Sequence, residues 1–385
     1  MAKHALLSAS SASRWLNCPK SVRLTEDIPD GESSSFAAEG TLAHAIAEDY
    51  LREYATGKGR TVEDYVVPEK FKGNPLFYDG MYQDVIPYLE YVVSTFESKS
   101  RVATLDVEAR LDFSKYVPSG FGTGDAVIID NGTLEICDLK FGKGVLVEAE
   151  NNPQIMLYGL GALHAYDYIF DIRNVKMTIV QPRLDHVASF VLSADELRDW
   201  GNNTVSPIAK LAYNGQGDQK AGDWCRWCKI KATCKARAEK QGQTVAMMAE
   251  AELTDDQICQ ILAASAEIKA WLSDIESHTV QRLSDGETLP GWKLVEGRSN
   301  RKIKEPEALA EKLLNCGVDA ARIYKPQELQ SLTALEKAVG KARFNELCGE
   351  YVYKPQGKAT LVPESDKRPA LGGVENDFNF EELKE

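Results

Sequence analysis

The chain has 385 residues, of which 43% are hydrophobic and 27% charged, a composition typical of a soluble globular protein with one large domain and an appended one. The net charge of −13 argues against non-specific avidity for nucleic acid, so any contact with DNA must use local basic patches. No apolar run approaches the roughly 18 residues of a membrane span, and the N-terminus does not resemble a signal peptide. We therefore expect a cytoplasmic protein without a membrane partner.

The first part of the chain is expected to be helical. Residues 8–24 predict a short serine-capped helix that ends at Cys18-Pro19. Residues 36–51 carry apolar side chains along one helical side and include His44. A lone histidine in such a helix is more often structural than a ligand, so this residue alone decides nothing.

A second long helix is predicted over residues 82–96, and residues 102–113 alternate like a strand. This strand supplies Glu108, which we expect near the functional site but do not count as a ligand. Two further β-type runs, DAVIID and TLEICDLK, lie on either side of Asn131-Gly132. An Asn-Gly pair between such runs is a strong hairpin signal, because both turn residues must accept positive φ.

The short turn fixes the register of this hairpin. Counting back from the residues next to the turn places Asp125 directly opposite Asp138, and strand alternation puts Lys140 on the same face. Two facing carboxylates repel unless a cation or a proton lies between them. Oxygen ligands suit Mg²⁺ or Mn²⁺, and the lysine can stabilise charge on a phosphate or orient a water. The alternative is a solvated face with two acids and one base.

A helix is predicted to begin after the hairpin. Asn152 is a good N-cap and Pro153 suits the first helical position. Gln154 and Tyr158 then share one face near the N-terminus, where backbone N–H groups favour a phosphate. The alternative is an ordinary amphipathic helix with a polar first turn.

Two strands over 174–193, with a turn near Leu184-Asp185, and a helix after Ser193 complete the pattern. The element order predicts an α/β fold in which helices flank both sides of a mixed sheet. From about residue 245 the sequence predicts a mainly helical region, with a long helix capped at Thr254 and ended by Gly286. A strand pair over 291–303 and helices over 305–317 and 331–351 follow, and the tail is expected to be disordered.

Three cysteines are clustered as Cys225-x-x-Cys228-x5-Cys234. Two cysteines three apart can direct both thiolates at one metal, and the third arrives from the following turn. A zinc site would take Cys18, His186 or Cys259 as its fourth ligand. Cys137 is expected in the core, and three cysteines lack ligand-like spacing: Cys259, Cys316 and Cys348.

Basic residues beside the cysteines and further along the chain are candidate DNA contacts, although a basic run is more often a solvated face. They are Lys229, Lys231, Lys235 and Arg237, and then Arg298, Arg301, Lys302 and Lys304. The chain has no G-x-x-x-x-G-K-[ST] phosphate loop, so we expect no ATP motor of its own.

Taken in order, these motifs resemble the PD-(D/E)XK nuclease superfamily, and more narrowly its RecB-type branch. The resemblance rests on Asp125 after a glycine-rich approach, Asp138-x-Lys140, and Gln154-x-x-x-Tyr158. The segment from Gly40 to His44 matches a G-x-x-x-H helix of this branch whose histidine joins the metal shell. The resemblance implies a restriction-endonuclease-like core with these roles: His44, Asp125, Asp138 and the Leu139 backbone carbonyl hold Mg²⁺ or Mn²⁺, Lys140 orients water or stabilises charge, and Gln154 and Tyr158 position the scissile strand.

One distant Cys-Pro together with C-x-x-C-x5-C is similar to the iron–sulfur members of this branch. The resemblance implies a [4Fe–4S] cluster on Cys18, Cys225, Cys228 and Cys234, which staples the N-terminus to the end of a nuclease domain. Trp224 and Trp227 would shield the cluster from water. The implied organisation is a nuclease domain over 1–240, a helical accessory region over 245–365 and a disordered tail over 366–385.

Over its whole length the chain resembles a family of uncharacterised phage and prophage proteins grouped with these nucleases. The resemblance implies a Mg²⁺- or Mn²⁺-dependent deoxyribonuclease, an exonuclease of DNA recombination, repair or replication in the bacterial or phage-infected cytoplasm. It would act on DNA ends or single strands, with a helicase or a single-strand annealing protein as a possible partner. The alternatives are a catalytically silent nucleic-acid-binding protein that keeps the nuclease fold, and a zinc-stapled regulatory protein.

Overall fold

The computed structural model describes residues 5–29, 35–58, 60–246, 253–295, 304, 306–316, 319, 323–324, 331–348, 351–352 and 366. The chain divides into two compact units, Met1–Thr279 and Val280–Glu385. The expected disordered tail lies outside the described residues apart from Asp366, and so does most of the expected strand pair over 291–303. Among the described residues, no helix is long and apolar enough to cross a membrane.

The first unit is built on a five-stranded mixed sheet with the order β1-β2-β3-β4-β5. Its strands are β1 (Thr104–Asp112), β2 (Phe121–Asp130), β3 (Thr133–Leu139), β4 (Asn174–Gln181) and β5 (His186–Ser193). Only β3 and β4 pair in parallel within this sheet. A parallel pair needs a long crossover, which α6 (Pro153–Phe170) supplies between them. The predicted mixed sheet flanked by helices is therefore confirmed.

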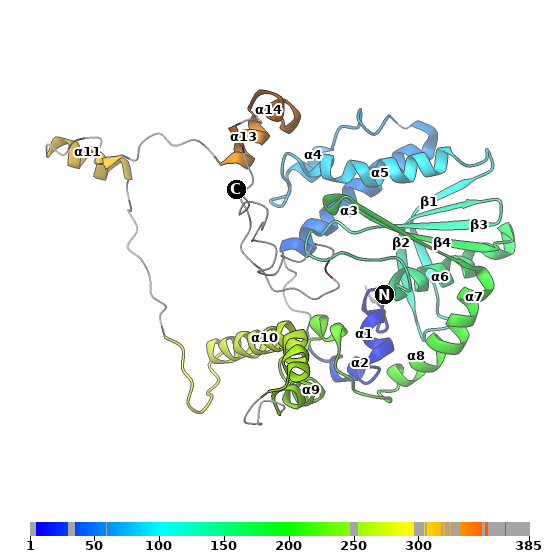
Figure 1. Ribbon diagram of the computed structural model, residues 1–385. Helices are drawn as coiled ribbons and strands as arrows, with labels where there is room; N and C mark the ends of the chain where they lie inside the picture. Colours follow the sequence, from blue (N-terminus) through cyan, green and yellow to red (C-terminus); the bar gives the residue numbers. More distant parts are fainter. Residues whose placement is uncertain are drawn as a thin grey trace, which may run out of the picture. The chain divides into compact units, whose positions relative to one another are not determined.

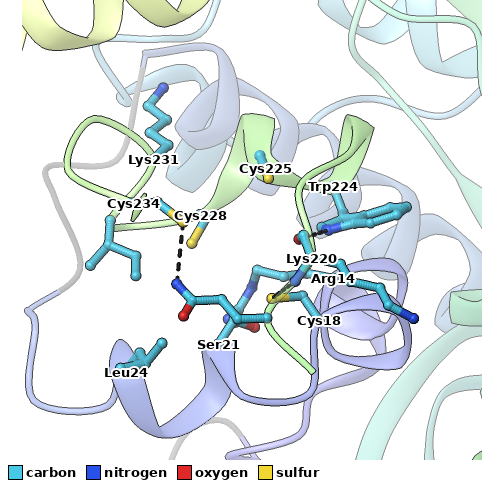
Figure 2. A pocket seen from close by; sticks show the side chains of 12 residues that line it. Arg14, Cys18, Ser21, Leu24, Lys220, Trp224, Cys225, Cys228, Lys231 and Cys234 are labelled. Atoms are coloured by element: carbon cyan, nitrogen blue, oxygen red, sulfur yellow. Dashed lines mark hydrogen bonds between the residues drawn. The ribbon is translucent and has the colours of Figure 1, made fainter. Parts of the chain in front are cut away.

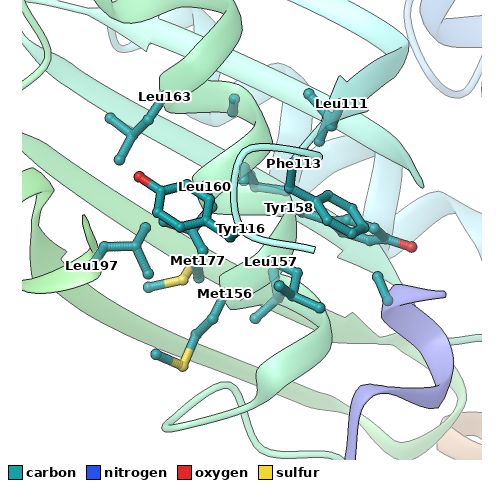
Figure 3. Close-up of a cluster of buried hydrophobic side chains, with 14 of the residues drawn as sticks. Leu111, Phe113, Tyr116, Met156, Leu157, Tyr158, Leu160, Leu163, Met177 and Leu197 are labelled. Carbon is teal, nitrogen blue, oxygen red and sulfur yellow. The ribbon is translucent and has the colours of Figure 1, made fainter. Parts of the chain in front are cut away.

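Helices cover both faces of the sheet, so each face has its own hydrophobic core (Figure 1). The helices α3 (Ser35–Glu53) and α5 (Met81–Glu97) pack on one face. The other face is covered by α6, α7 (Ala194–Trp200) and the N-terminal helix α1 (Ala12–Asn17). Figure 3 shows this second core, where Met156, Leu160 and Leu163 of α6 lie among side chains from the sheet.

The remaining elements are short turns of helix in the first unit and helices toward the C-terminus. They are η1 (Ala9–Ser11), α2 (Ser21–Leu24), η2 (Tyr54–Lys58), α4 (Glu69–Lys72), η3 (Pro182–Leu184), η4 (Gly201–Val205), α8 (Ser206–Tyr213), η5 (Asp223–Trp227), α9 (Lys235–Ala246), α10 (Asp255–Ser284), α11 (Pro306–Asn315), α13 (Leu332–Val339) and α14 (Lys341–Cys348). The predicted single helix over 331–351 is wrong, because Gly340 adopts φ +87° and separates α13 from α14.

Local sequence signals account for the elements around the functional residues. Asn131 and Gly132 both have positive φ, and Asp130 pairs with Thr133, as the hairpin prediction requires. Asn152 caps α6 by accepting a hydrogen bond from the backbone N–H of Gln154 at 3.0 Å. The predicted register and the predicted start of this helix are therefore confirmed.

Strand β1 changes faces at Glu108. Val107 belongs to the core beneath α3 and α5, whereas Ala109 belongs to the core beneath α6. Residues two apart in a regular strand point to the same face, so the backbone must turn over between them. Glu108 does this with φ +52°, a value that residues with a side chain rarely adopt. The reversal lies where the two cores meet, and there the functional residues gather.

Close packing of α6 on β1 depends on Gly161. A Cβ atom at this position would lie 2.9 Å from the Leu111 Cβ and 3.0 Å from the Leu111 carbonyl carbon, whereas one at Gly40 of α3 would have no atom within 4 Å. We predict that Gly161→Ala lowers the free energy of unfolding by about 1–3 kcal/mol through overpacking. The matched helical substitution Gly40→Ala should raise it by up to about 1 kcal/mol. Urea unfolding of both variants checks this, and equal shifts would contradict the packing argument.

Candidate functional site

Three potential ligands meet at the end of the hairpin. His44 comes from α3, Glu108 from β1 and Asp125 from β2, and one ligand atom from each lies within 4.8 Å of the other two. His44 Nδ1 is 3.2 Å from Asp125 Oδ1. The other oxygen of Asp125 accepts a hydrogen bond from the Leu139 N–H at 2.7 Å, so the carboxylate is held by both a helix and the neighbouring strand.

Asp138 and Lys140 follow on β3 and directly after it. Asp138 is only 4% exposed, and its Oδ2 lies 2.7 Å from the Lys140 Nζ. This oxygen nevertheless accepts no hydrogen bond of good geometry. Burial of a carboxylate oxygen is costly, and here the compensation comes from its ion pair with Lys140.

The electrostatics show that acids outnumber cations in this site. Burial and the charge of Asp125 raise the pKa of Asp138 despite the nearby lysine. Burial and the charges of Asp125 and Glu48 raise the pKa of Glu108 to about 7. Burial alone would lower the pKa of His44, but the charge and hydrogen bond of Asp125 outweigh it and raise that pKa. A divalent cation would relieve this repulsion among carboxylates.

Neighbouring charges also shift the pKa values of Asp125 and Lys140. Burial opposes ionisation of Asp125, yet the charge of His44 and the Leu139 N–H together hold its pKa below the usual value. Burial would also lower the pKa of Lys140, but the charge of Asp138 outweighs it and raises that pKa. Asp125 and Lys140 are therefore both ionised at neutral pH.

Gln154 and Tyr158 join the site from α6. The Gln154 side-chain amide donates to the Tyr158 hydroxyl at 3.2 Å. Burial and the charge of Asp138 raise the pKa of Tyr158 to about 12, so the phenol stays neutral. A Cβ atom at Gly122 would lie 2.6 Å from the Tyr158 ring. The glycine-rich approach to Asp125 therefore leaves room for this ring against β2.

The nitrogen and oxygen donors of this site fit a hard divalent cation, and the nearby Asp138 carboxylate offers a further oxygen ligand. The structure brings His44 and Asp125 together and adds Glu108 to the group, while Asp138 is near enough for its charge to raise the pKa of His44. Sequence reasoning left Glu108 aside because the hairpin turn sets only the register between β2 and β3. The signal was the register between β1 and β2, whose pairs Val107–Ala126 and Ala109–Gly124 set Glu108 across from Asp125.

The four cysteines of the expected cluster line one pocket, shown in Figure 2. Cys18 caps the end of α1, Cys225 and Cys228 lie in and after η5, and Cys234 precedes α9. No three of their sulfurs lie within 4.8 Å of one another in the described part of the chain. Thiolates around one tetrahedral zinc ion would be about 3.8 Å apart. The four sulfurs are therefore spaced more widely than thiolates around one zinc ion.

Several expectations about the residues around this pocket need correction. Neither His186 nor Cys259 lines the pocket, so Cys18 is the fourth cysteine there. Trp224 lines the pocket, but Trp227 is 76% exposed and does not. Its proposed shielding role is therefore wrong, because its ring extends into solvent beside Arg226.

Exposure also changes the interpretation of the basic residues. Arg237 is only 3% exposed and pairs with Asp274 at 2.6 Å, so it cannot serve as a surface contact for DNA. Lys231 pairs with the same aspartate at 2.8 Å. Arg298, Arg301 and Lys302 lie outside the described residues. The expected core position of Cys137 is confirmed by its complete burial.

The fold and site define an α/β protein with an acid–histidine–lysine centre at the open end of the β2–β3 hairpin and a separate four-cysteine pocket. Residues 4–369 match the family described as "Protein of unknown function (DUF2800)". The chain belongs to this family. Among solved structures it is similar to "Crystal structure of SSO0001", with 14% identity over 58% of this chain and 96% of that chain and a TM-score of 0.22.

The metal-ligand role of Glu108 can be tested directly. We predict that Glu108→Gln weakens Mn²⁺ binding by at least about tenfold, because the site loses a charged ligand. Glu90→Gln, at an exposed position of α5, removes the same charge and should leave the affinity unchanged. Titration of free Mn²⁺ by electron paramagnetic resonance measures both. Wild-type affinity in Glu108→Gln would exclude Glu108 from the ligand set.

Proton competition gives a second prediction. In the metal-free protein the pKa of Glu108 is about 7, so below this pH a bound proton must leave before the carboxylate can hold a cation. Mn²⁺ affinity should therefore rise as the pH increases through about 7, and the rise should be shallower in Glu108→Gln. Calorimetric titrations in buffers of different ionisation enthalpy would detect the released proton, and a pH-independent affinity would contradict this assignment.

Proposed function

We propose that this protein is a metal-dependent deoxyribonuclease of the PD-(D/E)XK type. The observation that carries the proposal is the buried Asp138 carboxylate, one oxygen of which has an ion pair but no well-aligned hydrogen bond. It lies 2.7 Å from the Lys140 ammonium group, next to the group formed by His44, Glu108 and Asp125. A site that combines an excess of carboxylates with one partly exposed lysine suits a divalent cation and a phosphate side by side.

The proposed ligands of Mg²⁺ or Mn²⁺ are His44, Glu108, Asp125 and Asp138, with the Leu139 carbonyl as a further candidate. When bound, such an ion lowers the pKa of a water and neutralises charge on the phosphoryl group. Asp125 is positioned for this by the His44 ring and the Leu139 N–H. The fixed position of a ligand matters because reorganisation during the reaction would raise the barrier.

Lys140 and the first turns of α6 would act on the DNA strand. Lys140 remains protonated next to Asp138, and can therefore stabilise negative charge on the phosphate or orient the attacking water. Gln154 lies in the first turn of α6, where the positive end of the helix dipole favours a phosphate. The neutral Tyr158 hydroxyl accepts a hydrogen bond from the Gln154 side-chain amide. This bond would orient both side chains for contact with the DNA strand.

For the four-cysteine pocket we propose a [4Fe–4S] cluster with a structural role. The chemistry of the donor set supports this, because four thiols line one pocket yet are too far apart for one zinc ion. The cluster would join Cys18 to the segment from Cys225 to Cys234. We extend the proposal to an exonuclease of phage or prophage DNA metabolism that acts on DNA ends or single strands, with a helicase or annealing protein as partner.

The proposal is tested with end-labelled linear and circular DNA, single- and double-stranded, in the presence of Mg²⁺ or Mn²⁺. We predict degradation of linear DNA only. Asp138→Ala and Lys140→Ala should each lower the rate by at least about 100-fold, because each removes a group that meets charge in the transition state. Lys143→Ala, at an exposed position on the same segment, is the control and should remain active.

Each other outcome has a distinct meaning. Wild-type protein that binds DNA but cuts nothing with either metal would replace the nuclease by a catalytically silent binding protein. Full activity in Asp138→Ala would place the chemistry elsewhere. Cleavage of circular DNA would keep the nuclease and exclude a strict exonuclease.

A further inference from the structure

One short segment supplies hydrogen-bond donors to three of the four cysteines in the pocket. Residues 219–222 pass along it, and the backbone N–H of Lys220 donates to the Cys18 sulfur at 3.4 Å. The backbone N–H of Gly222 donates to the Cys225 sulfur at 3.4 Å. The same segment also reaches Cys234, whose sulfur accepts a hydrogen bond from the side-chain amide of Gln219 at 3.4 Å (Figure 2).

Burial raises the pKa of the Cys228 thiol, and the neighbouring backbone of Ile230 opposes this shift. Of the three sulfurs with a hydrogen-bond donor from the 219–222 segment, two receive it from the backbone. Cys234 is the exception in two respects. Its donor is a side chain, and it is partly exposed whereas the other three cysteines are buried.

The segment that carries Gln219 is held in place by Trp224. The indole N–H donates to the Lys220 carbonyl at 2.9 Å. A Cβ atom at Gly222 would lie 2.5 Å from the Trp224 ring, so the ring packs directly on the backbone of the segment. This packing holds the backbone on the C-terminal side of Gln219.

A hydrogen bond to a thiolate has two effects on an iron–sulfur group. It stabilises negative charge on the sulfur, and reduction adds negative charge, so each donor favours the reduced form and raises the reduction potential. It also orients the thiolate and opposes its loss from the metal. At Cys234 both effects depend on one replaceable side chain.

We propose that Gln219 is the positioning residue that secures Cys234 as a ligand and raises the reduction potential of the group in this pocket. Cys234 is then the corner at which the group is lost first, because it is the most exposed thiol and has no backbone donor. This inference rests on the proposed [4Fe–4S] cluster. It concerns the stability and potential of that cluster and requires no redox step in DNA cleavage.

The test uses the full chain purified without oxygen. Gln219→Leu removes the donor with little change in volume, and Gln219→Glu replaces it by a carboxylate of the same shape. Gln216→Leu is the control, because it makes the same Gln-to-Leu change at an exposed position of the same loop. Dithionite titration followed by electron paramagnetic resonance gives the midpoint potential. Loss of visible absorbance with a chelator gives the rate of iron loss.

We expect a lower midpoint potential and about tenfold faster iron loss in Gln219→Leu. Gln219→Glu should lower the potential further and lose iron faster still, because a negative charge then faces the thiolate. Gln216→Leu should match the wild type. Potential and rate equal to the wild type in an iron-loaded Gln219→Leu would overturn the proposal. So would an altered rate with an unaltered potential in both Gln219 variants, since that pattern indicates a role in folding only.

The outcome also separates this inference from the proposed function. A wild-type chain that is colourless and free of iron would refute the cluster and the role of Gln219 together, without affecting the nuclease assay. A brown wild-type protein whose Gln219 variants behave normally would refute only the role of Gln219.

Discussion

The arrangement of the first unit depends on keeping three carboxylates together at one end of its sheet. Asp138 is buried and Glu108 and Asp125 are partly buried, and only His44 and Lys140 balance them within the group. Such a cluster opposes folding unless surrounding elements impose it. Here the short hairpin turn sets β2 against β3, and the helices on both faces secure the sheet. The stability of the two hydrophobic cores offsets the repulsion that the site retains.

The reversal of β1 at Glu108 makes this site accessible from both layers. Residues before it pack beneath α3, and residues after it pack beneath α6. His44 can therefore approach Asp125 from one layer, while Tyr158 approaches Asp138 from the other. A regular strand would have kept its side chains on fixed faces throughout. The strained backbone at Glu108 is thus a local cost that serves the site, as strain at functional positions commonly does.

The sequence predicted features that depend on local chemistry and missed those that depend on distant partners. Asn131-Gly132 determined the hairpin register, and Asn152 with Pro153 determined the start of α6. Glu108 could not be assigned, because its place depends on a positive φ and on pairing between β1 and β2. Burial of Arg237 could not be foreseen either, since it requires Asp274, 37 residues away. The spacing of the cysteines predicted a shared pocket but not the donors that surround it.

The position of Cys18 has a consequence for the order in which the chain folds. Its sulfur meets Lys220 across 202 positions, and Arg23 bonds the Tyr213 carbonyl across 190. During synthesis the N-terminal helices must remain without these partners until the whole sheet has emerged. Closing so long a loop carries a large entropy cost, which a shared cofactor would help to offset. The first segment made is therefore among the last to be secured, and a chain cut short before Tyr213 lacks both of these contacts.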